Sequence, residues 1–238
     1  MSGLIRARLA SARPVSPDVT DFRFALESPA TLEFLPGQFV TFAIGMDSHG
    51  QPIRRSYSLA SSLHNRHEIR LLIKLLPDGP AHDFFATLAP GQNVDMTGPH
   101  GFFVLDAHHH GDVVFAATGT GLAPILPMLD ELAQRQEPGR RYLFWGLRAA
   151  RDLFLEQELR ALCKAAQTDL HIYLSQPGPT WAENNGRITE PVLTLLPGLT
   201  KPTFYLVGNG NMIRELKKRL MDAGINRKQH IRTEAFFD

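Results

Sequence analysis

The pattern of hydrophobic runs changes once along the chain, near Asp106, and this change restricts the fold more than any other feature. Before Asp106, short β-type runs alternate with turn residues, which is typical of a small antiparallel barrel. After it, apolar strand-like runs alternate with helix-length segments, which is typical of a doubly wound parallel sheet. A chain of 238 residues has room for both. We expect a two-domain protein with an antiparallel β-barrel in residues 1–107 followed by an α/β domain in residues 108–238.

The expected elements follow from these runs and from the turns between them. In the first half we expect a strand from Leu4, further strands at residues 19–26, 39–44, 54–59, 68–76 and 93–97, and a short helix at 82–88. In the second half we expect strands at 113–117, 142–145, 170–174 and 204–207, and helices at 122–136, 152–166 and 212–223. Three adjacent histidines, His108 to His110, fall at the boundary. Consecutive linker residues point in different directions, so we interpret them as a solvated linker and expect no metal site.

Charge and cysteine content exclude several classes of function. A net charge of +1 gives no reason to expect nucleic acid or a membrane surface as partner, and no apolar run is long enough to span a bilayer. The single cysteine, Cys163, cannot form an internal disulfide or ligate an iron–sulfur cluster, and its leucine-rich surroundings predict a packing role. The arginines near the N-terminus fit a first strand better than a transit peptide. We expect a soluble cytoplasmic protein.

A glycine-rich turn opens the second half and suggests a nucleotide site. Gly119 and Gly121 follow a buried strand and precede a helix, so backbone N–H groups can approach a pyrophosphate. A glycine turn needed only for packing would look the same. The third glycine of the usual fingerprint is absent, and Gly146-Leu147-Arg148 stands where an acidic residue would follow the second strand. The segment is therefore not a standard dehydrogenase site.

The first half carries a more specific signal, Arg55-Ser56-Tyr57-Ser58, on an expected strand. Alternation points Arg55 and Tyr57 to one face and the two serines to the other, while local twist can bring Ser58 back toward a ligand. An arginine beside an aromatic ring suits a ligand that has both a phosphate and a flat ring system. Any one of these residues alone would be better explained by an ordinary surface role. The four together are better explained by a ligand site.

Five motifs, taken in order, resemble the ferredoxin–NADP(H) reductase family over nearly the whole chain. They are Arg55 to Ser58, Gly98-Pro99-His100-Gly101-Phe102, Gly119 to Pro124, Tyr205 to Met212, and Glu234-Ala235-Phe236. The resemblance implies a flavin-binding barrel and an NAD(P)-binding domain, with FAD as cofactor and FMN as the less favoured choice. It implies that Arg55 neutralises a flavin phosphate, Tyr57 packs on the flavin ring and Ser58 hydrogen-bonds near the atom that receives the hydride.

Further contacts to both ligands are implied by position in the motifs. Gly79, Ala81 and His82 fall at the family's second phosphate-binding turn, although His82 replaces the usual Ser or Thr, and Ile73 and Lys74 lie on the strand before it. Val207 replaces the cysteine that usually lies beside the nicotinamide. The other residues implied for the nucleotide are Thr118, Gly119, Gly121, Arg148, Ser175, Arg187, Gly208, Asn209 and Met212. Gln176 follows Ser175 where an arginine would favour NADPH, so we expect use of both nucleotides with a preference for NADH.

The end of the chain is implied to act on the flavin. In the family a terminal aromatic lies over the flavin, which assigns Phe236 as a displaceable lid and Glu234 as a polar contact or proton relay; the alternative is that the terminal rings only close the core. Residues 214–232 hold seven Lys/Arg against two acids, so this stretch either steers a small acidic carrier such as ferredoxin or flavodoxin or is simply a solvated surface. The leading function is hydride transfer from NAD(P)H to FAD and electron transfer to such a carrier or to an oxygenase component. A reductase of free flavin and a non-catalytic electron-relay subunit remain alternatives.

Overall fold

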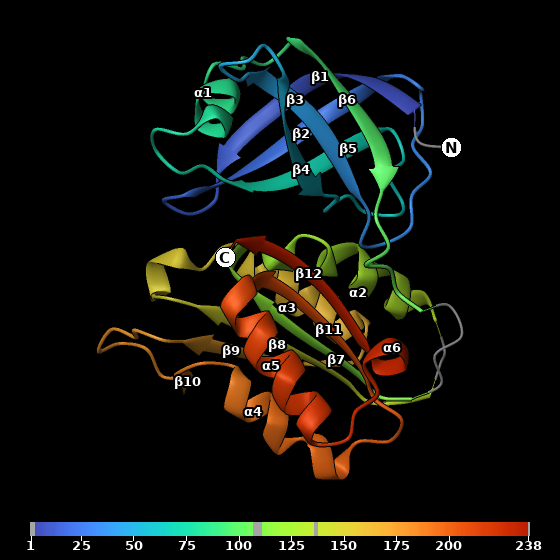
Figure 1. The fold of residues 1–238 in the computed structure, drawn as a ribbon, viewed down its shortest axis with the longest axis vertical. Coiled ribbons are helices and arrows are strands. Elements are labelled where there is room, and N and C mark those ends of the chain that lie inside the picture. Colours follow the sequence, from blue (N-terminus) through green and yellow to red (C-terminus); the bar gives the residue numbers. More distant parts are fainter. Residues whose placement is uncertain (1–2, 107–110, 136–137, 238) are drawn as a thin grey trace.

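The computed structural model describes residues 3–106, 111–135 and 138–237 and has two domains stacked end to end (Figure 1). The first domain is one curled antiparallel sheet with a short helix. Its elements are β1 (Gly3–Pro14), β2 (Val19–Ser28), β3 (Phe39–Met46), β4 (Pro52–Ser58), β5 (Glu68–Lys74), α1 (Pro80–Ala86) and β6 (Asn93–His100).

The strand order in this sheet is β4-β3-β6-β1-β2-β5, and curling brings the two edges together, as an isolated bridge between Leu59 and Leu71 shows. Period-two alternation determines which residues face inward. In β1, for example, Ile5, Ala7 and Leu9 are buried, while Leu4, Arg6 and Arg8, which alternate with them, are exposed. The barrel core contains a cluster of aromatic rings from β2, β3 and α1.

The second domain alternates strands and helices (Figure 1). Its elements are β7 (Val113–Thr118), a 3-10 helix (Gly119–Leu122), α2 (Ile125–Gln134), β8 (Arg141–Leu147), a 3-10 helix (Ala150–Asp152), α3 (Glu156–Ala165), β9 (Thr168–Leu174), β10 (Asn184–Asn185), α4 (Thr189–Thr194), a 3-10 helix (Leu196–Gly198), β11 (Thr203–Asn209), α5 (Gly210–Asp222), α6 (Arg227–His230) and β12 (Ile231–Phe237).

All neighbours in this second sheet are parallel, in the order β10-β9-β8-β7-β11-β12. One face packs on α2 and α3, and the other packs on α4 and α5. The chain proceeds in one direction from β7 to β10 and then crosses to the other side of β7, so the strand order reverses between β7 and β11. In such sheets the carboxyl ends of the two strands at the reversal frame a ligand crevice.

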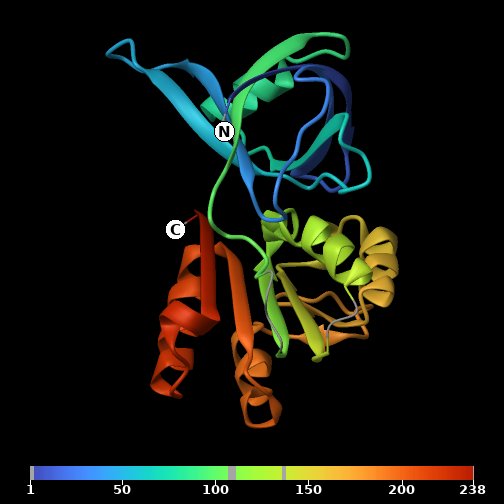
Figure 2. The ribbon, with the colours of Figure 1, turned by 90° about the vertical axis from the view of Figure 1, so that its right-hand side faces the viewer.

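A continuous apolar contact joins the two domains. The core cluster between the sheet, α2 and α3 also includes Val19, Ala60, Leu72 and Phe103 from the barrel side. Figure 2 shows α2 directly below the barrel, and it shows the end of β12 reaching toward the barrel on the opposite side. The domains therefore meet along a packed seam that also includes polar contacts.

The expected fold class is confirmed, with some differences in detail. The helices expected from residues 122 and 152 begin at Ile125 and Glu156, because a 3-10 turn precedes each of them. The C-terminal residues form a sixth parallel strand, β12, which sequence patterning did not identify as a strand. The expected domain boundary at 107/108 and His108 to His110 lie outside the described residues. Cys163 is buried in the core, where burial raises the pKa of its thiol to about 12.

No helix in residues 3–106, 111–135 and 138–237 is both long and apolar enough to cross a bilayer. Over these same ranges there is also no group of three or more His, Cys, Asp or Glu side chains arranged to hold a metal ion.

Candidate functional site

A cleft of about 630 Å³ lies at the carboxyl ends of β7 and β11, where the strand order reverses. It is bounded below by the second domain and above by barrel residues from the β1–β2 turn and from β5. Eight of its lining residues were expected from the sequence. They are Lys74, Thr118, Gly119, Arg148, Ser175, Arg187, Asn209 and Met212.

The glycines near the base of this cleft are required for two different reasons, a left-handed backbone conformation and close packing. Gly119 has a φ of 54° and open space where a Cβ would be, so it provides a left-handed turn with exposed backbone. Gly121 has no such freedom, because a Cβ there would come within 2.8 Å of the carbonyl oxygen of Val207. Gly208, with a φ of 113°, similarly leaves no room beside Thr118. The packing interpretation thus holds for Gly121 and Gly208, whereas Gly119 lines the cleft.

The start of α5 faces the same cleft. Its cap is Asn209, whose side chain accepts a hydrogen bond from the Met212 N–H at 3.1 Å, and the Asn209 N–H donates to Thr118 Oγ1 at 2.8 Å. Two short loops are thereby fixed to each other at the ends of adjacent strands. A long helix that begins here favours negative charge. Together with the open backbone at Gly119, this arrangement fits the phosphates of a dinucleotide.

The charged side chains around the cleft are of both signs. Arg148 donates to the Gln176 side chain at 2.9 Å, and Lys74 lies 3.6 Å from Asp18, so both cations are partly engaged within the protein. Arg187 and Ser175 are exposed at the rim. The cleft is also lined by Asp18, Asp152 and Glu215, which sequence reasoning did not identify because isolated acidic residues look like ordinary surface charges.

The flavin motif lies on β4, an edge strand of the barrel. Tyr57 is half-buried and packs edge-to-face on Phe85 with ring centroids 5.2 Å apart, while burial raises the pKa of its hydroxyl to about 12. Arg55 is exposed, and within the described residues it pairs with no carboxylate and donates only to the Arg54 carbonyl. Ser56 shares a hydrogen bond with Thr41 at 2.9 Å. An unpaired guanidinium next to a held aromatic ring fits a phosphorylated flat ligand such as a flavin.

Ser58 and Glu234 form a contact between the domains. The Ser58 hydroxyl at the end of β4 donates to Glu234 Oε1 on β12 at 2.8 Å. Burial raises the pKa of Glu234 above its ordinary value, and the hydrogen bond from Ser58 lowers it by a smaller amount. The two polar residues that the family resemblance assigns to the flavin therefore meet, although 176 positions separate them in the chain.

A second cleft, of about 830 Å³, is lined by Glu234 and shares no lining residue with the first. The starts of β3 and β12 and the segment after β6 form its walls. At its edge stands Phe102, whose side chain is 95% exposed, and Arg232 of β12 is also part of the lining. Phe102 belongs to the motif Gly98 to Phe102, but its exposure could not be expected from the sequence, because an aromatic residue after a strand can be either buried or exposed.

Other expected ligand contacts are only partly supported by their placement. The Ile73 side chain is fully buried in the barrel core, so only its backbone can face a ligand. Gly79 caps α1, and Ala81 and His82 lie half-buried in its first turn; none of the three lines either cleft. Val207 is buried on β11 against the glycine turn.

Phe236 occupies a β-bulge. The pairing of β12 with β11 runs from Gly208–Ala235 directly to Asn209–Phe237, which leaves Phe236 as the extra residue. A bulge redirects the side chain of the extra residue. The Phe236 ring is half-buried and packs at the edge of the second-domain core that also contains Val207 and Trp145.

Comparisons with known proteins agree with this architecture. Family models for an oxidoreductase FAD-binding domain and an oxidoreductase NAD-binding domain match residues 6–105 and 115–218. Ferredoxin--NADP reductase B of Sorangium cellulosum is 28% identical over 240 residues, which cover 97% of this chain and 96% of that protein. The ferredoxin--NAD(+) reductase component of the alkene monooxygenase system of Xanthobacter autotrophicus is 32% identical over 201 residues, 83% of this chain and 60% of its own length.

Solved structures share the fold across both domains. The Amycolatopsis cytochrome P450 reductase superposes with a TM-score of 0.86 at 24% identity and covers all of this chain, which in turn covers 71% of that protein. A ferredoxin NADP+ reductase from Neisseria gonorrhoeae with bound FAD and NADP gives 0.79 at 22% identity, with 98% of each chain covered. Both domain families match, the FAD-binding family on the barrel and the NAD-binding family on the α/β domain. The chain therefore belongs to the ferredoxin–NADP reductase family and is an oxidoreductase with FAD as cofactor and NAD(P)H as co-substrate.

Proposed function

We propose that this enzyme takes a hydride from NAD(P)H bound in the cleft at β7 and β11, transfers it to FAD held by the barrel, and passes the electrons to a separate ferredoxin or oxygenase component. The bound flavin supplies the chemistry, since it accepts a hydride and releases electrons to an acceptor. The protein must therefore bind both ligands, hold them in register and exclude water.

The hydrogen bond between Ser58 and Glu234 is the observation that carries this proposal. It joins the strand with the flavin motif to the strand that ends the nucleotide-binding domain. Ser58 is buried, so its hydroxyl has a fixed direction rather than a choice of water partners. We assign Ser58 to orient the flavin and Glu234 to hold a proton next to it, because a carboxyl with a raised pKa keeps its proton to a higher pH than an ordinary glutamate.

Each ligand is assigned its own set of binding residues. Arg55 binds a flavin phosphate and Tyr57 packs on the ring, while backbone groups of residues 118–121 and the start of α5 bind the pyrophosphate of the nucleotide. Val207 packs beside the nicotinamide. Arg148, Ser175 and Arg187 lie at the rim of the cleft and recognise the ribose and its substituent.

The acceptor assignment is supported by the relatives and by the second cleft. The relatives include reductase components of methane, propane and alkene monooxygenase systems, of which this chain spans 45 to 67%. The cleft that contains Phe102 is also lined by Glu234, and it has no lining residue in common with the nucleotide cleft. A carrier bound there would be close to the flavin without displacing NAD(P)H.

The direct test is anaerobic bleaching of the purified yellow holoenzyme by NADH and NADPH in parallel, followed by addition of a ferredoxin. We expect bleaching with both nucleotides, reoxidation by ferredoxin, and slower bleaching in Ser58→Ala. Ser48→Ala is the control, because Ser48 is exposed at the far end of the same hairpin. Loss of the chromophore on desalting would instead indicate a reductase of free flavin, and a chromophore that neither nucleotide bleaches would refute the proposal.

A further inference from the structure

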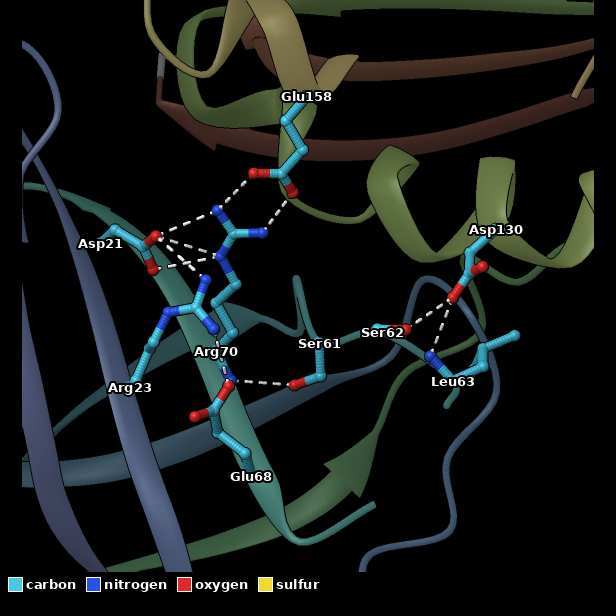
Figure 3. Close-up of polar contacts among 9 residues, drawn as sticks. All are labelled: Asp21, Arg23, Ser61, Ser62, Leu63, Glu68, Arg70, Asp130 and Glu158. Carbon is cyan, nitrogen blue, oxygen red and sulfur yellow. Dashed lines mark hydrogen bonds and ion pairs between the residues drawn. The ribbon is translucent and has the colours of Figure 1, made fainter. Parts of the chain in front are cut away.

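Apart from the packed apolar seam, barrel segment 58–70 makes a series of polar contacts with the second domain. Ser58 at its start donates to Glu234 of β12, and Ser62 in its middle donates to Asp130 of α2 at 2.9 Å. At its end, Arg70 of β5 binds Glu158 of α3 (Figure 3). The segment that carries the flavin-motif serine is thus attached to three elements of the nucleotide-binding domain.

Arg70 links charges on both sides of the seam. Its Nε donates to both carboxylate oxygens of Asp21 at 3.1 and 3.2 Å, and its Nη2 donates to Asp21 Oδ2 and to Glu158 Oε2, each at 3.0 Å. Nη1 donates to Glu158 Oε1. Arg70 and Asp21 are both buried, whereas Glu158 is partly exposed on α3. The guanidinium is therefore held bidentately by a carboxylate from each domain, an arrangement that fixes direction as well as distance.

Two backbone N–H groups of the segment donate hydrogen bonds to side chains and fix the loop between β4 and β5. Arg70 N–H donates to the Ser61 hydroxyl at 2.8 Å, and Leu63 N–H donates to Asp130 Oδ2 at 3.0 Å (Figure 3). Asp130 thus accepts hydrogen bonds from Ser62 and Leu63, and the Arg70 backbone donates to Ser61 of the same loop. Movement of α3 away from β5 would consequently displace residues 61–63.

The same strand connects this contact to the nucleotide cleft. Arg70, Leu72 and Lys74 alternate with core residues on β5 and so point to one side of the strand. Leu72 packs into the second-domain core and Lys74 lines the nucleotide cleft. A change in the angle between the domains at Arg70 would therefore shift both the barrel wall of that cleft and Ser58.

We propose that Arg70 and Glu158, together with Asp130, are positioning residues that set the orientation of the flavin-binding barrel over the nucleotide-binding domain. The proposal rests on the function given above, in which two ligands on different domains must meet. A misplacement of about 1 Å between reacting groups costs on the order of a hundredfold in rate. The apolar seam alone does not fix such an angle, because hydrophobic contact is non-directional.

The decisive variant is Glu158→Gln in the holoenzyme. Arg70 keeps its hydrogen bonds to Asp21 in this variant, so we expect it to fold. Glu156→Gln is the matched control, since Glu156 lies two residues away on α3, is similarly exposed, and pairs with Arg160 of the same helix. We expect Glu158→Gln to slow flavin bleaching at saturating nucleotide by about tenfold, with KM and the melting temperature close to those of the control.

Amide hydrogen exchange gives a second readout that does not depend on turnover. We expect Glu158→Gln to increase exchange at Leu63 as well as at Arg70, and Asp130→Asn to increase it at Arg70 as well as at Leu63. A purely local role would change only the amide next to each substitution and would leave bleaching equal to that of Glu156→Gln; either result overturns the proposal. If neither nucleotide bleaches the wild-type enzyme, the proposed function fails, while the exchange experiment still decides whether the contact couples the domains.

Discussion

The Ser58 hydroxyl of the barrel and the Glu234 carboxyl of the last strand are 2.8 Å apart, and they form a hydrogen bond across the domain boundary. Glu234 has no cationic partner among the causes that shift its pKa. Burial favours the protonated carboxyl, and only the Ser58 hydrogen bond opposes this. The pair therefore makes the junction between the domains sensitive to pH.

Stability should decrease as Glu234 ionises. Because the folded-state pKa lies above the ordinary value of 4.5, the contribution of the protonated carboxyl is fully present below pH 4.5 and is lost as the pH rises through the raised pKa. Glu234→Gln stays neutral, so we expect its melting temperature to exceed that of the wild type above the raised pKa and to approach it in acid. Asp169→Asn, at an exposed position on β9, is the control. Equal differences from wild type at all pH values would contradict this prediction.

Arg55→Ala should weaken flavin retention. The substitution removes a charge-assisted phosphate contact worth about 1.5 to 3 kcal/mol. Arg54→Ala is a close control because Arg54 is adjacent, is also exposed, and points to the other face of the strand. We expect a lower ratio of flavin to protein for Arg55→Ala after identical purification. Equal flavin content in both variants would remove Arg55 from the flavin site.

The nucleotide cleft should accept both NADH and NADPH, with a modest preference for NADH. Arg148 and Arg187 can approach a 2′-phosphate, but Arg148 is already bonded to Gln176, and the acids Asp18, Asp152 and Glu215 oppose additional negative charge. Arg187→Ala should therefore reduce kcat/KM for NADPH more than for NADH. A preference of wild-type enzyme for NADPH above about a hundredfold, or about 2.7 kcal/mol, would show the expected preference to be wrong.

Reduction of a carrier should depend on Phe102 more than on the basic residues of α5. Lys218 is paired with Asp222 at 2.6 Å and Arg219 with Glu190, which reduces the free positive charge that the sequence indicated for residues 214–232. Phe102, by contrast, projects from the rim of the second cleft. We expect Phe102→Ser to raise the KM for ferredoxin several-fold while bleaching by NAD(P)H stays unchanged.

Charge reversal at Lys217 and Lys218 tests the other surface. If these lysines steer an acidic carrier, the double variant should lower the association rate and weaken its dependence on salt. If this double variant impairs ferredoxin reduction and Phe102→Ser does not, the carrier docks over α5 rather than at the second cleft.

The sequence predicted the parts of this molecule that depend on local pattern. Alternation along the early strands and the glycine turn before α2 identified both domains, and motif order placed Thr118, Asn209 and Met212 around one cleft. Patterning missed β12, because Arg232, Thr233 and Glu234 interrupt its apolar residues and leave no continuous apolar run. A strand of this kind is stabilised by its pairing with β11, which is a tertiary contact.

The domain seam could not be predicted for a similar reason. Asp21, Arg70 and Glu158 are distant in sequence, and each would be an ordinary surface charge on an isolated strand or helix. Only the packed structure shows that Arg70 is buried and binds both Asp21 and Glu158. Motif resemblance did bring Ser58 and Glu234 to attention, but their direct contact depends on the orientation of the domains.

Phe236 could act either as a displaceable lid over the flavin or as a core packing residue. The bulge in β12 is the structural reason to favour the lid. Phe236 is the extra residue of the bulge, and its half-buried ring packs at the edge of the core. Its removal therefore leaves the backbone pairing of Gly208 and Ala235 intact. We expect Phe236→Ser to retain flavin and to melt within a few degrees of the wild type.

The kinetic signature of such a lid is a change in KM. A ring that competes with the nicotinamide for the flavin face weakens nucleotide binding, so Phe236→Ser should lower the KM for NADH and slow release of NAD+. Stopped-flow reduction and product-release measurements on the same preparation separate these two effects. A sharp fall in melting temperature with unchanged nucleotide kinetics per folded enzyme would instead assign the ring to the core, because a packing residue contributes to the free energy of unfolding but not to competition at the flavin.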